Sequence, residues 1–353
     1  MRVVVVGATG NVGTSVLHAL AADERVESIV GLARRRPTLE WPKTTWVEAD
    51  ISDDDGALDH HFRGADCVVH LGWLIQPSRD EATLYATNVD GSQRVFNATV
   101  RADVPALVYA SSVGAYSPGP KDRAVDESWA TDGIQTSFYS RHKAATERLL
   151  DSLEAQHPDL RVVRLRPGLI FKREAATGIR RLFGGPFIPN PLVRRSLIPI
   201  VPKIERLRFQ AVHSMDVGDA YRRAIVNDDA RGAYNVAAEP VLDPDELGRL
   251  LGARPVPLPE SALRVGADVT WRLRLQPSPK GWVDMALNCP IMSTRRIRDE
   301  LGWSETRSSG EALVELLDGM RDGSGVDTPP LAPETSGPMR VREVLTGIGR
   351  TSK

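Results

Sequence analysis

The alternation of short apolar runs with longer helical patterns through the first half of the chain restricts its fold more than any other feature. Runs rich in β-branched residues predict strands at Val3–Val6, Ser28–Leu32, Thr45–Glu48, Asp66–His70, Ala106–Ala110 and Arg161–Arg166. Helical patterns lie between them, at Val12–Ala22, Glu81–Arg101 and Tyr139–Gln156. Strands that alternate with helices, and that are apolar almost throughout, predict a parallel sheet covered on both faces. We therefore expect an α/β fold with a doubly wound parallel sheet.

The second half of the chain loses this alternation after Gly168. Residues 172–205 are rich in Pro, Gly, Arg and bulky apolar types, and predicted elements follow at Val217–Val226, Gly232–Val236, Asp243–Leu251 and 289–303. From Asp322 onward Gly, Pro, Ser and Thr predominate, which is typical of a mobile tail. We expect a first domain over residues 1–170, completed by elements up to about 235. A smaller C-terminal α/β region over 171–321, interleaved with the first, and a mobile tail over 322–353 complete the expected organisation.

The composition excludes several classes of protein. In 353 residues, 45 Lys and Arg oppose 46 Asp and Glu, so the formal net charge is −1, and we expect no nucleic-acid partner. The two cysteines, Cys67 and Cys289, are too few for a disulfide framework and lack metal-ligand spacing, so we expect no metal. No signal peptide is apparent, and no stretch approaches the roughly 18 apolar residues of a membrane span. A cytoplasmic protein without a membrane partner is expected.

A glycine-rich turn joins the first predicted strand to the first predicted helix. It reads Gly7-Ala8-Thr9-Gly10-Asn11-Val12-Gly13. Such a turn lets the backbone approach a dinucleotide pyrophosphate closely, and the helix N-terminus directs N–H groups at the anion. The turn predicts a Rossmann-type dinucleotide site at Gly7, Thr9, Gly10, Asn11, Val12 and Gly13. The alternative is a helix-start turn that binds no ligand.

The end of the second strand bears on the choice of dinucleotide. A carboxylate about 20 residues past the glycine turn usually binds the ribose of NAD, but Arg34-Arg35-Arg36 stands there instead. The Arg34 guanidinium suits the 2′-phosphate of NADP, so NADP is mildly favoured over NAD. The alternative is a solvated basic loop.

Two further strand ends supply candidate cofactor contacts. Asp50 and Ile51 follow the third strand, where a carboxylate can accept a hydrogen bond from adenine; alternatively, Asp50 caps the next helix. Leu71 and Gly72 follow the fourth strand, and a small residue there lets the cofactor lie close. His70 is expected to be structural.

A tyrosine and a lysine share one face of the helix before the sixth strand. Tyr139 and Lys143 stand at i and i+4, so both side chains lie on the same side. A free phenol has a pKa of about 10, and a nearby cation favours the phenolate, so the pair can act as a base. Ser112, after the fifth strand, is positioned to bind a substrate oxygen, although its neighbour Ser111 is an alternative. The other interpretation of Tyr139 and Lys143 is a surface pair.

With these motifs the chain resembles the extended short-chain dehydrogenase/reductase superfamily, in its NAD-dependent epimerase/dehydratase branch. The motifs are the Gly7–Gly13 turn, Ser111-Ser112, Tyr139-xxx-Lys143, Arg166-Pro167-Gly168, Thr87-Asn88-Val89-Asp90-Gly91-Ser92 and Val212-His213-Ser214-Met215-Asp216-Val217. The resemblance covers residues 1–225 well and the remainder loosely. One departure is Gly72-Trp73, where the branch has small residues such as Ala-Ala.

The resemblance implies a role for each matching residue. Tyr139 would be the general acid/base, Lys143 would bind the nicotinamide ribose and lower the tyrosine pKa, and Ser112 would orient the substrate. Asn88 would help to hold the active-site helix. The cofactor would further contact Ala110, Ser111, Pro167 and Gly168. A homodimer through the helices near 81–101 and 139–156 is implied as well.

The substrate remains open at this stage. In this family segments 172–205 and 255–285 would form the walls of the substrate site. Arginines in and near these segments either bind the diphosphate of a nucleotide sugar or are simply solvated. The apolar residues there would suit an apolar alcohol or ketone instead. The arginines are Arg180, Arg181, Arg194, Arg195 and Arg208. Three functions compete: an NAD(P)-dependent oxidoreductase, a nucleotide-sugar epimerase or dehydratase with permanently bound NAD, and a non-catalytic dinucleotide-binding redox sensor.

Overall fold

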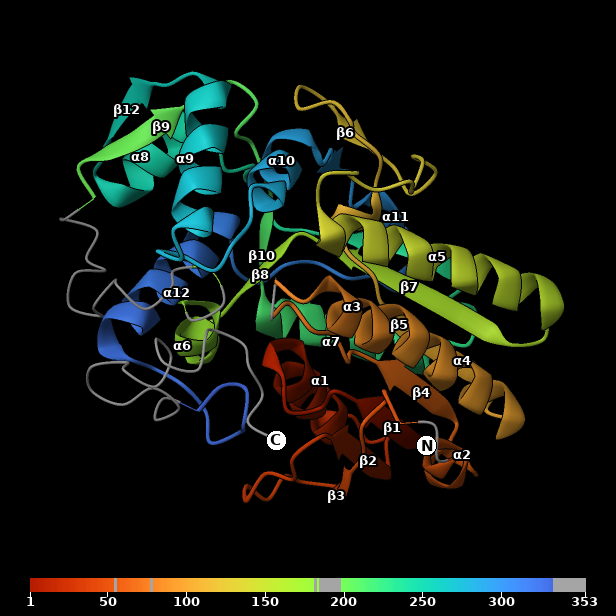
Figure 1. Cartoon of the computed structure of the whole chain (residues 1–353). Coiled ribbons are helices and arrows are strands. Elements are labelled where there is room, and N and C mark those ends of the chain that lie inside the picture. Colours follow the sequence, from red (N-terminus) through yellow and green to blue (C-terminus); the bar gives the residue numbers. More distant parts are fainter. Residues whose placement is uncertain (54–55, 77–78, 181–182, 184–197, 333–353) are drawn as a thin grey trace.

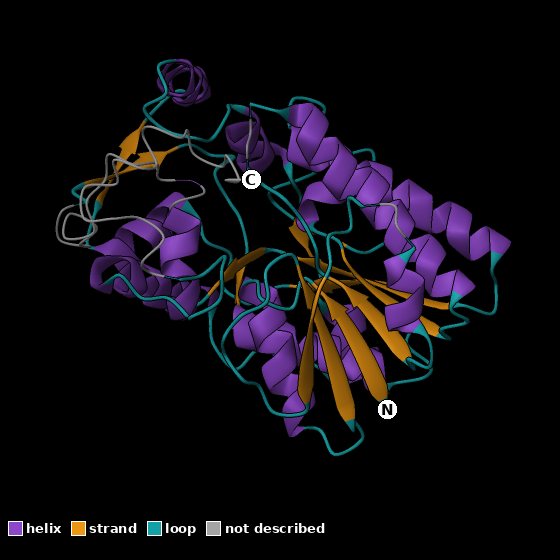
Figure 2. Cartoon of the chain, turned by 60° about the horizontal axis from the view of Figure 1, so that its bottom comes forward, coloured by secondary structure: helices purple, strands orange, loops and turns teal. Residues whose placement is uncertain are grey.

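A seven-stranded sheet, parallel throughout, forms the centre of the molecule (Figures 1 and 2). The computed structural model describes residues 1–53, 56–76, 79–180, 183 and 198–332. From one edge to the other, the strands are β11 (Gly232–Val236), β7 (Arg161–Pro167), β5 (Ala106–Ala110), β4 (Cys67–His70), β1 (Arg2–Val6), β2 (Ser28–Ala33) and β3 (Thr44–Glu48). The order reverses direction at β1, which places the ends of β1 and β4 at a topological switch point, where doubly wound folds bind ligands.

Helices cover both faces of this sheet, as its two-sided apolar strands require. One face packs against α1 (Asn11–Ala22), α7 (Ser214–Val226) and α11 (Arg295–Leu301). The other packs against α2 (Ala57–Phe62), α4 (Gly91–Arg101) and α5 (Phe138–Gln156). Helices α1 and α7 approach closely, because a Cβ at Gly218 would lie 2.5 Å from the Ser15 carbonyl oxygen. The predicted α/β fold with a doubly wound parallel sheet of the Rossmann type is confirmed.

A smaller group of elements lies beyond the carboxyl ends of the strands, spread over the left and upper parts of Figure 1. It contains the parallel pairs β8 (Leu169–Phe171) with β10 (Ala211–His213), and β9 (Ile200–Lys203) with β12 (Arg254–Pro257). A third pair joins β6 (Ala124–Val125) to β13 (Ile291–Met292). The accompanying helices are α6 (Ala176–Ile179), α8 (Pro244–Leu251), α9 (Glu260–Arg272), α10 (Gly281–Asn288) and α12 (Ser309–Asp322), with short 3-10 turns at Val113–Ala115 and Arg173–Ala175.

Two expectations are corrected by the fold. The single helix predicted over Glu81–Arg101 is divided into α3 (Glu81–Tyr85), a π-helical turn (Ala86–Asp90) and α4, because the segment widens where Asn88 binds the backbone of Leu74. The tail predicted to be mobile from residue 322 is packed over residues 323–332, where Thr328 is 1% exposed. Residues 333–353 lie outside the described part of the chain. Among the described helices, none is long and apolar enough to span a bilayer.

Candidate functional site

The glycine-rich turn has the geometry of an anion cradle. Gly7 has φ +84°, and a Cβ there would lie 2.8 Å from the Gly72 nitrogen. A Cβ on Gly13 would lie 2.5 Å from the carbonyl oxygens of Gly7 and Ala8. Gly10 caps α1 with no side-chain hydrogen bond, so no capping side chain occupies the amides of the first helical turn. The turn therefore fits a phosphate group at the positive end of α1.

Asn11 and Val12 complete this turn as the first residues of α1. The Asn11 side-chain nitrogen donates to the Ile170 carbonyl (3.2 Å), while its oxygen is buried and has no partner among the described residues. A buried acceptor without a donor is costly. A donor group on a bound ligand would satisfy it.

Residues at the neighbouring strand ends border the turn to different degrees. Leu71 is fixed by its N–H, which donates to the Val6 carbonyl (2.8 Å), and Gly72 lies against Gly7. Arg34 is exposed after β2. The Asp50 carboxylate accepts from the Ser52 amide (2.9 Å) and hydroxyl (2.7 Å), which closes a local turn. The expected alternative, that Asp50 caps the next helix, is wrong, because the N-cap of α2 is Gly56. Ile51 is buried and packs under Gly91.

Tyr139 and Ser112 are neighbours at the carboxyl end of β5. The Ser112 hydroxyl accepts from the Gly114 amide (3.0 Å), and the Tyr139 ring lies so close to Gly114 that a Cβ there would be 3.0 Å from a ring carbon. Burial raises the pKa of Tyr139 to about 12, and hydrogen bonding with Ser112 offsets part of that rise. At neutral pH the phenol is protonated and can donate its proton to an oxygen held beside Ser112.

Lys143 lies one turn further along α5 and faces the same strand end. Its ammonium donates to the Ala110 carbonyl (2.6 Å) and lies 3.5 Å from the centre of the Trp73 ring. Burial holds the pKa of Lys143 well below its ordinary value. Burial and Ser112, rather than Lys143, govern the pKa of Tyr139 in this structure, and the lysine contacts the Trp73 face and a carbonyl. The role of Lys143 in lowering the tyrosine pKa stays a prediction.

Trp73, where the resemblance implied a small residue, packs on Tyr139 and Lys143. Its ring meets Tyr139 edge to face, with centroids 5.9 Å apart, and its indole nitrogen is buried without a partner among the described residues. Asn88 fixes the neighbouring backbone, since it accepts from the Leu74 amide (2.7 Å) and donates to the Leu74 carbonyl (2.8 Å). Asn88 thus holds the backbone next to Trp73. The resemblance implied that Asn88 helps to hold the active-site helix, which is α5.

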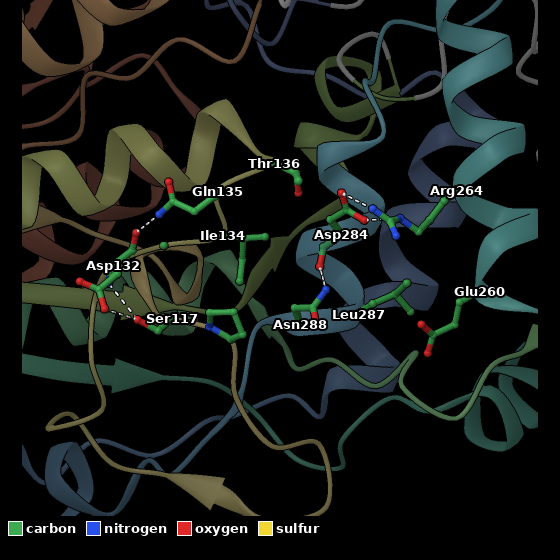
Figure 3. Close-up of a pocket in the computed structure, with 12 residues that line it drawn as sticks. Ser117, Asp132, Ile134, Gln135, Thr136, Glu260, Arg264, Asp284, Leu287 and Asn288 are labelled. Carbon is green, nitrogen blue, oxygen red and sulfur yellow. Dashed lines mark hydrogen bonds and ion pairs between the residues drawn. The ribbon is translucent and has the colours of Figure 1, made fainter.

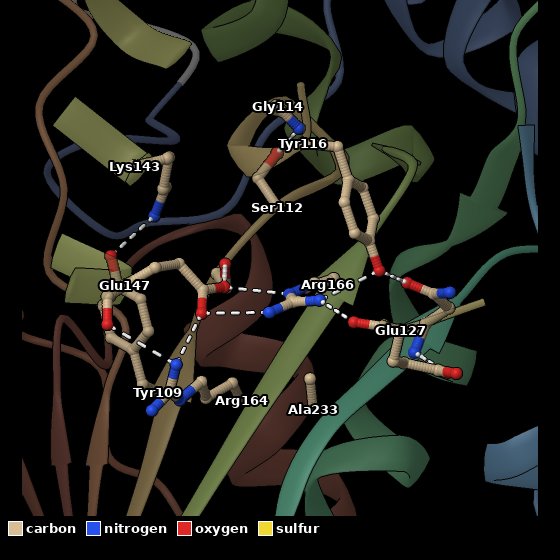
Figure 4. A network of polar contacts seen from close by, with 12 residues as sticks. Tyr109, Ser112, Gly114, Tyr116, Glu127, Lys143, Glu147, Arg164, Arg166 and Ala233 are labelled. Atoms are coloured by element: carbon tan, nitrogen blue, oxygen red, sulfur yellow. Dashed lines mark hydrogen bonds and ion pairs between the residues drawn. The ribbon is translucent and has the colours of Figure 1, made fainter. Parts of the chain in front are cut away.

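The Ser111 hydroxyl binds a different group of residues from Ser112. Its buried hydroxyl donates to Glu147, which also binds Arg164 (2.9 Å) and Arg166 (2.9 Å). Arg166 continues to the Tyr116 hydroxyl (3.0 Å), as Figure 4 shows. The arginines hold the pKa of Glu147 at about 2 despite its burial. Sequence reasoning missed this network, although arginines within an apolar strand and an acid four residues after Lys143 were available signals.

Two further predicted residues have packing roles in the structure. A Cβ on Gly168 would lie 2.5 Å from the Gln210 carbonyl oxygen, so glycine is required for the approach of two backbones. Pro167 is buried as the last residue of β7, where it pairs with Val236.

His70 is fully buried, hydrogen-bonded to the Ser92 hydroxyl (2.8 Å), with its pKa lowered by burial to about 3. His70 is therefore structural, as the sequence indicated.

The wall around Tyr139 contains residues that sequence reasoning did not single out. Trp282 of α10 lies 5.0 Å from the Tyr139 ring centroid, and Phe183 meets Trp282 edge to face at 4.8 Å. Met285 packs against Gly114 together with the tyrosine. These neighbours make the surroundings of the phenol apolar and aromatic.

A pocket of about 480 Å³ lies on the other side of α10 (Figure 3). Asp132, Thr136, Arg264 and Asp284 are among its lining residues, and Arg264 pairs with Asp284 at 2.7 Å. None of Ser112, Tyr139 and Lys143 lines it. Of the arginines considered for a diphosphate, Arg180 is buried, the Arg208 carbonyl accepts from Lys121 (2.7 Å), and Arg181, Arg194 and Arg195 lie outside the described residues.

Comparison with known proteins gives relatives of several activities. Over 111 residues the chain is 38% identical to an L-arabinose 1-dehydrogenase (NAD(P)(+)) of Haloferax volcanii, covering 31% of this chain and 41% of that protein. Over 149 residues it is 34% identical to a decarboxylating sterol-4-alpha-carboxylate 3-dehydrogenase of Candida albicans, covering 40% and 41%. The chain thus spans about two-fifths of the length of these two relatives.

Solved structures match over a greater length at lower identity. A UDP-glucose 4-epimerase of Thermus thermophilus in complex with NAD has a TM-score of 0.67 and 21% identity, over 91% of this chain and 99% of that one. A dTDP-glucose 4,6-dehydratase of Streptomyces venezuelae with NAD bound has a TM-score of 0.64 and 18% identity, over 91% and 97%. At these identities the likeness establishes the fold. The model of the NAD dependent epimerase/dehydratase family matches residues 3–237, well over half of the chain, and the chain belongs to that family.

Proposed function

We propose that this chain transfers hydride between a bound NAD(P) and a secondary alcohol or ketone, with Tyr139 as general acid/base. The observation that supports this most is the convergence of the Tyr139 phenol and the Ser112 hydroxyl at the end of β5, on the same sheet edge as the glycine cradle. The dinucleotide, when bound, supplies or accepts the hydride. Its pyrophosphate would lie on Gly7–Gly13, and Lys143 would bind its nicotinamide ribose.

The proton is handled by the chain's own residues. In the direction of reduction, Tyr139 gives its proton to the carbonyl oxygen while Ser112 holds that oxygen. A tyrosine whose pKa is raised to about 12 rests as the neutral phenol, which is the form this direction requires. In the direction of oxidation the phenol must first ionise, and the nearby Lys143 ammonium would stabilise the phenolate as it forms. The region from residue 171 to 321 would form the substrate wall.

The second candidate is a nucleotide-sugar epimerase or dehydratase that keeps NAD bound through its cycle. It is supported by the agreement in fold with the epimerase and the dehydratase over 91% of the chain. The two candidates differ in the cofactor content of purified protein. Retained NAD that survives gel filtration supports the epimerase or dehydratase, whereas dependence on added NAD(P)H supports the oxidoreductase. A redox sensor that does no chemistry is the third possibility, and it predicts no turnover of any substrate.

The decisive test is Tyr139→Phe, which removes the phenolic oxygen and keeps the ring against Trp73 and Trp282. We expect turnover to fall by at least about 10³-fold, because the proton has no acceptor or donor. NAD(P)H should bind with unchanged affinity, measured by calorimetry. Tyr116→Phe, which loses a buried hydroxyl outside the catalytic pair, is the matched control and should keep most activity. A Tyr139→Phe variant as active as the wild type would remove the tyrosine from the mechanism.

The choice between the two dinucleotides rests on the exposed Arg34. We propose that NADP is mildly favoured, since a guanidinium suits the 2′-phosphate. Arg34→Ala should raise the Kd for NADPH by about tenfold and leave the Kd for NADH nearly unchanged. Arg36→Ala, in the same exposed run, is the control. Equal changes for both dinucleotides would contradict the preference for NADP.

A further inference from the structure

We propose that the C-terminal segment, residues 323–332, is part of the dinucleotide site, and that Thr328 is a positioning residue for the glycine-rich turn. This inference rests on the cofactor site proposed above and adds to it an element from the far end of the chain. The Thr328 hydroxyl donates to the Thr9 carbonyl at 2.9 Å, across 319 positions of sequence. Thr9 stands in the middle of the turn, between Gly7 and Gly10.

The contact between Thr328 and Thr9 is buried and its geometry is fixed. Thr328 is 1% exposed. Its amide donates to the Val326 carbonyl (2.7 Å), and its own carbonyl accepts from the amides of Leu331 and Ala332, both at 2.9 Å. These bonds close residues 326–332 into a compact turn. The hydroxyl therefore reaches Thr9 from a rigid support.

The direction of the Thr9 carbonyl bears on anion binding. The Thr9 carbonyl and the Gly10 N–H belong to one planar peptide unit and point in opposite directions. When Thr328 holds the carbonyl, it also sets the orientation of the Gly10 amide, which donates to the Gly7 carbonyl at 3.2 Å. A carbonyl free to rotate towards the ligand would present negative charge to a phosphate. Thr328 therefore keeps the turn in the form that accepts an anion.

A second contact joins the same segment to the loop after β2. The Thr38 hydroxyl donates to the Asp327 carboxylate at 3.1 Å. In a dinucleotide-binding fold, the turn after β1 faces the pyrophosphate and the end of β2 faces the adenosine ribose. The segment thus touches both of the loops that would surround this half of the cofactor.

The segment is itself anchored on the substrate side of the molecule. The Thr177 hydroxyl donates to the Ser324 carbonyl at 2.7 Å, and a Cβ on Gly178 would lie 3.2 Å from the Pro330 carbonyl oxygen. Both belong to α6. The segment therefore connects α6 to the glycine-rich turn, and Thr328 is its point of contact with that turn.

The test compares two variants of the full-length chain at one position. Thr328→Val keeps the shape of the side chain and loses the donor, whereas Thr328→Ser keeps the donor. By calorimetry, Thr328→Val should raise the Kd for both NADH and NADPH by about tenfold, the effect of leaving a buried carbonyl unpaired. Thr328→Ser should stay within about twofold of the wild type. At saturating dinucleotide, kcat should be unchanged.

Thr99→Val is the matched control. Thr99 is fully buried, and its hydroxyl donates to the Val95 carbonyl at 2.8 Å in α4, away from the turn. Its loss should lower the Tm and leave both Kd values unchanged, which separates a binding role from a stability role. Thr38→Val, at an exposed position, is a second and safer variant if Thr328→Val does not fold, with an expected rise in Kd of about two- to threefold.

The outcomes separate this inference from the proposed function. A wild-type chain that binds neither dinucleotide overturns both. A wild type that binds, together with Thr328→Val and Thr38→Val variants that bind equally well, overturns only the role of the C-terminal segment. A rise in Kd for Thr328→Val that Thr328→Ser reproduces in full would also overturn it, because the donor would then be irrelevant.

Discussion

The first two turns of α5 set Tyr139 and Lys143 among aromatic and apolar side chains, whereas the following turn sets Glu147 between two arginines. The three residues follow one another at intervals of four, so they lie along one stripe of the same helix. Lys143 is 3% exposed, Glu147 is fully buried, and Tyr139 is half-buried with a pKa that burial governs. Their surroundings differ in one respect, which is the presence of an ion partner.

That difference decides whether the pKa of each group shifts in favour of its neutral form or of its charged form. Burial without an ion partner favours the neutral forms, so the pKa of Tyr139 is raised and that of Lys143 is lowered. Burial with two guanidinium groups keeps Glu147 charged. The paired charge attaches α5 to β7, while the groups without an ion partner are those for which proton transfer is proposed above.

The largest expected effect is on stability, from Glu147→Gln. Losing the carboxylate leaves Arg164 and Arg166 without their shared buried partner, so the free energy of unfolding should fall by about 3 kcal/mol. Urea denaturation at pH 7 measures it. Asp151→Asn is the control, because Asp151 pairs with the same Arg164 but its side chain is 61% exposed; its effect should be small. Equal losses of unfolding free energy in the two variants would contradict the view that the buried ion pairs of Glu147 stabilise α5.

The next effect is catalytic, from Lys143→Met. The methionine keeps the apolar packing under Trp73 and removes the cation, so kcat/KM should fall by about 10²- to 10³-fold. The free energy of unfolding should stay the same or rise, since a buried ammonium is lost. Steady-state kinetics and urea denaturation of the same variant provide the two measurements. A large loss of stability with little loss of activity would contradict the catalytic role proposed for Lys143.

Low pH should destabilise the protein by protonating Glu147. Because the folded-state pKa of Glu147 is depressed from 4.5 to about 2, its contribution to stability is present above pH 4.5 and is lost as the pH falls towards 2. The pKa of His70 is lowered by burial from 6.5 to about 3, so the contribution of His70 to stability is also lost as the pH falls from 6.5 towards 3. The free energy of unfolding of the wild type should therefore fall steeply below pH 4.5. In Glu147→Gln the slope between pH 4.5 and 2 should be shallower; an unchanged slope would exclude Glu147 as its source.

The smallest expected effect is from Trp73→Phe. Phenylalanine preserves a ring over Lys143, but it gives a weaker cation–π contact, by about 1 kcal/mol or less. We expect kcat to change by no more than about fivefold, and Trp73→Ala to change it more. Kinetics of the two variants across pH 6–10 would show whether the ring influences the lysine. Identical pH profiles for wild type and Trp73→Ala would show that it does not.

Local patterns account for what could be predicted. Strands Ala106–Ala110 and Gly232–Val236 have the bounds expected from sequence, and the first of them is an apolar run that is buried almost throughout. Tyr139 and Lys143 were found for the same reason, since their spacing is local. The two-residue strands β6 and β13 have no pattern of their own and exist only through pairing with each other.

Long-range contacts account for what could not be predicted. The choice between Ser111 and Ser112 depends on Glu147, which attracts the Ser111 hydroxyl from a separate helix. Thr328 is one threonine in a polar stretch, and its partner lies 319 residues away. The division of the Glu81–Arg101 helix depends on Asn88 binding the backbone of the preceding loop. No property of these segments, taken alone, indicates those partners.

The buried ammonium of Lys172 has a consequence for how the enzyme can move. It follows β8, yet it donates to the Asn11 carbonyl (2.9 Å), the Thr14 hydroxyl (2.6 Å) and the Ser15 hydroxyl (3.0 Å) among the first five residues of α1. Opening a cleft between the two halves at this point would strip three hydrogen bonds from a cation that is 4% exposed. We therefore expect a substrate to enter by loop or side-chain motion near Tyr139, and the two halves to unfold together in a single cooperative transition.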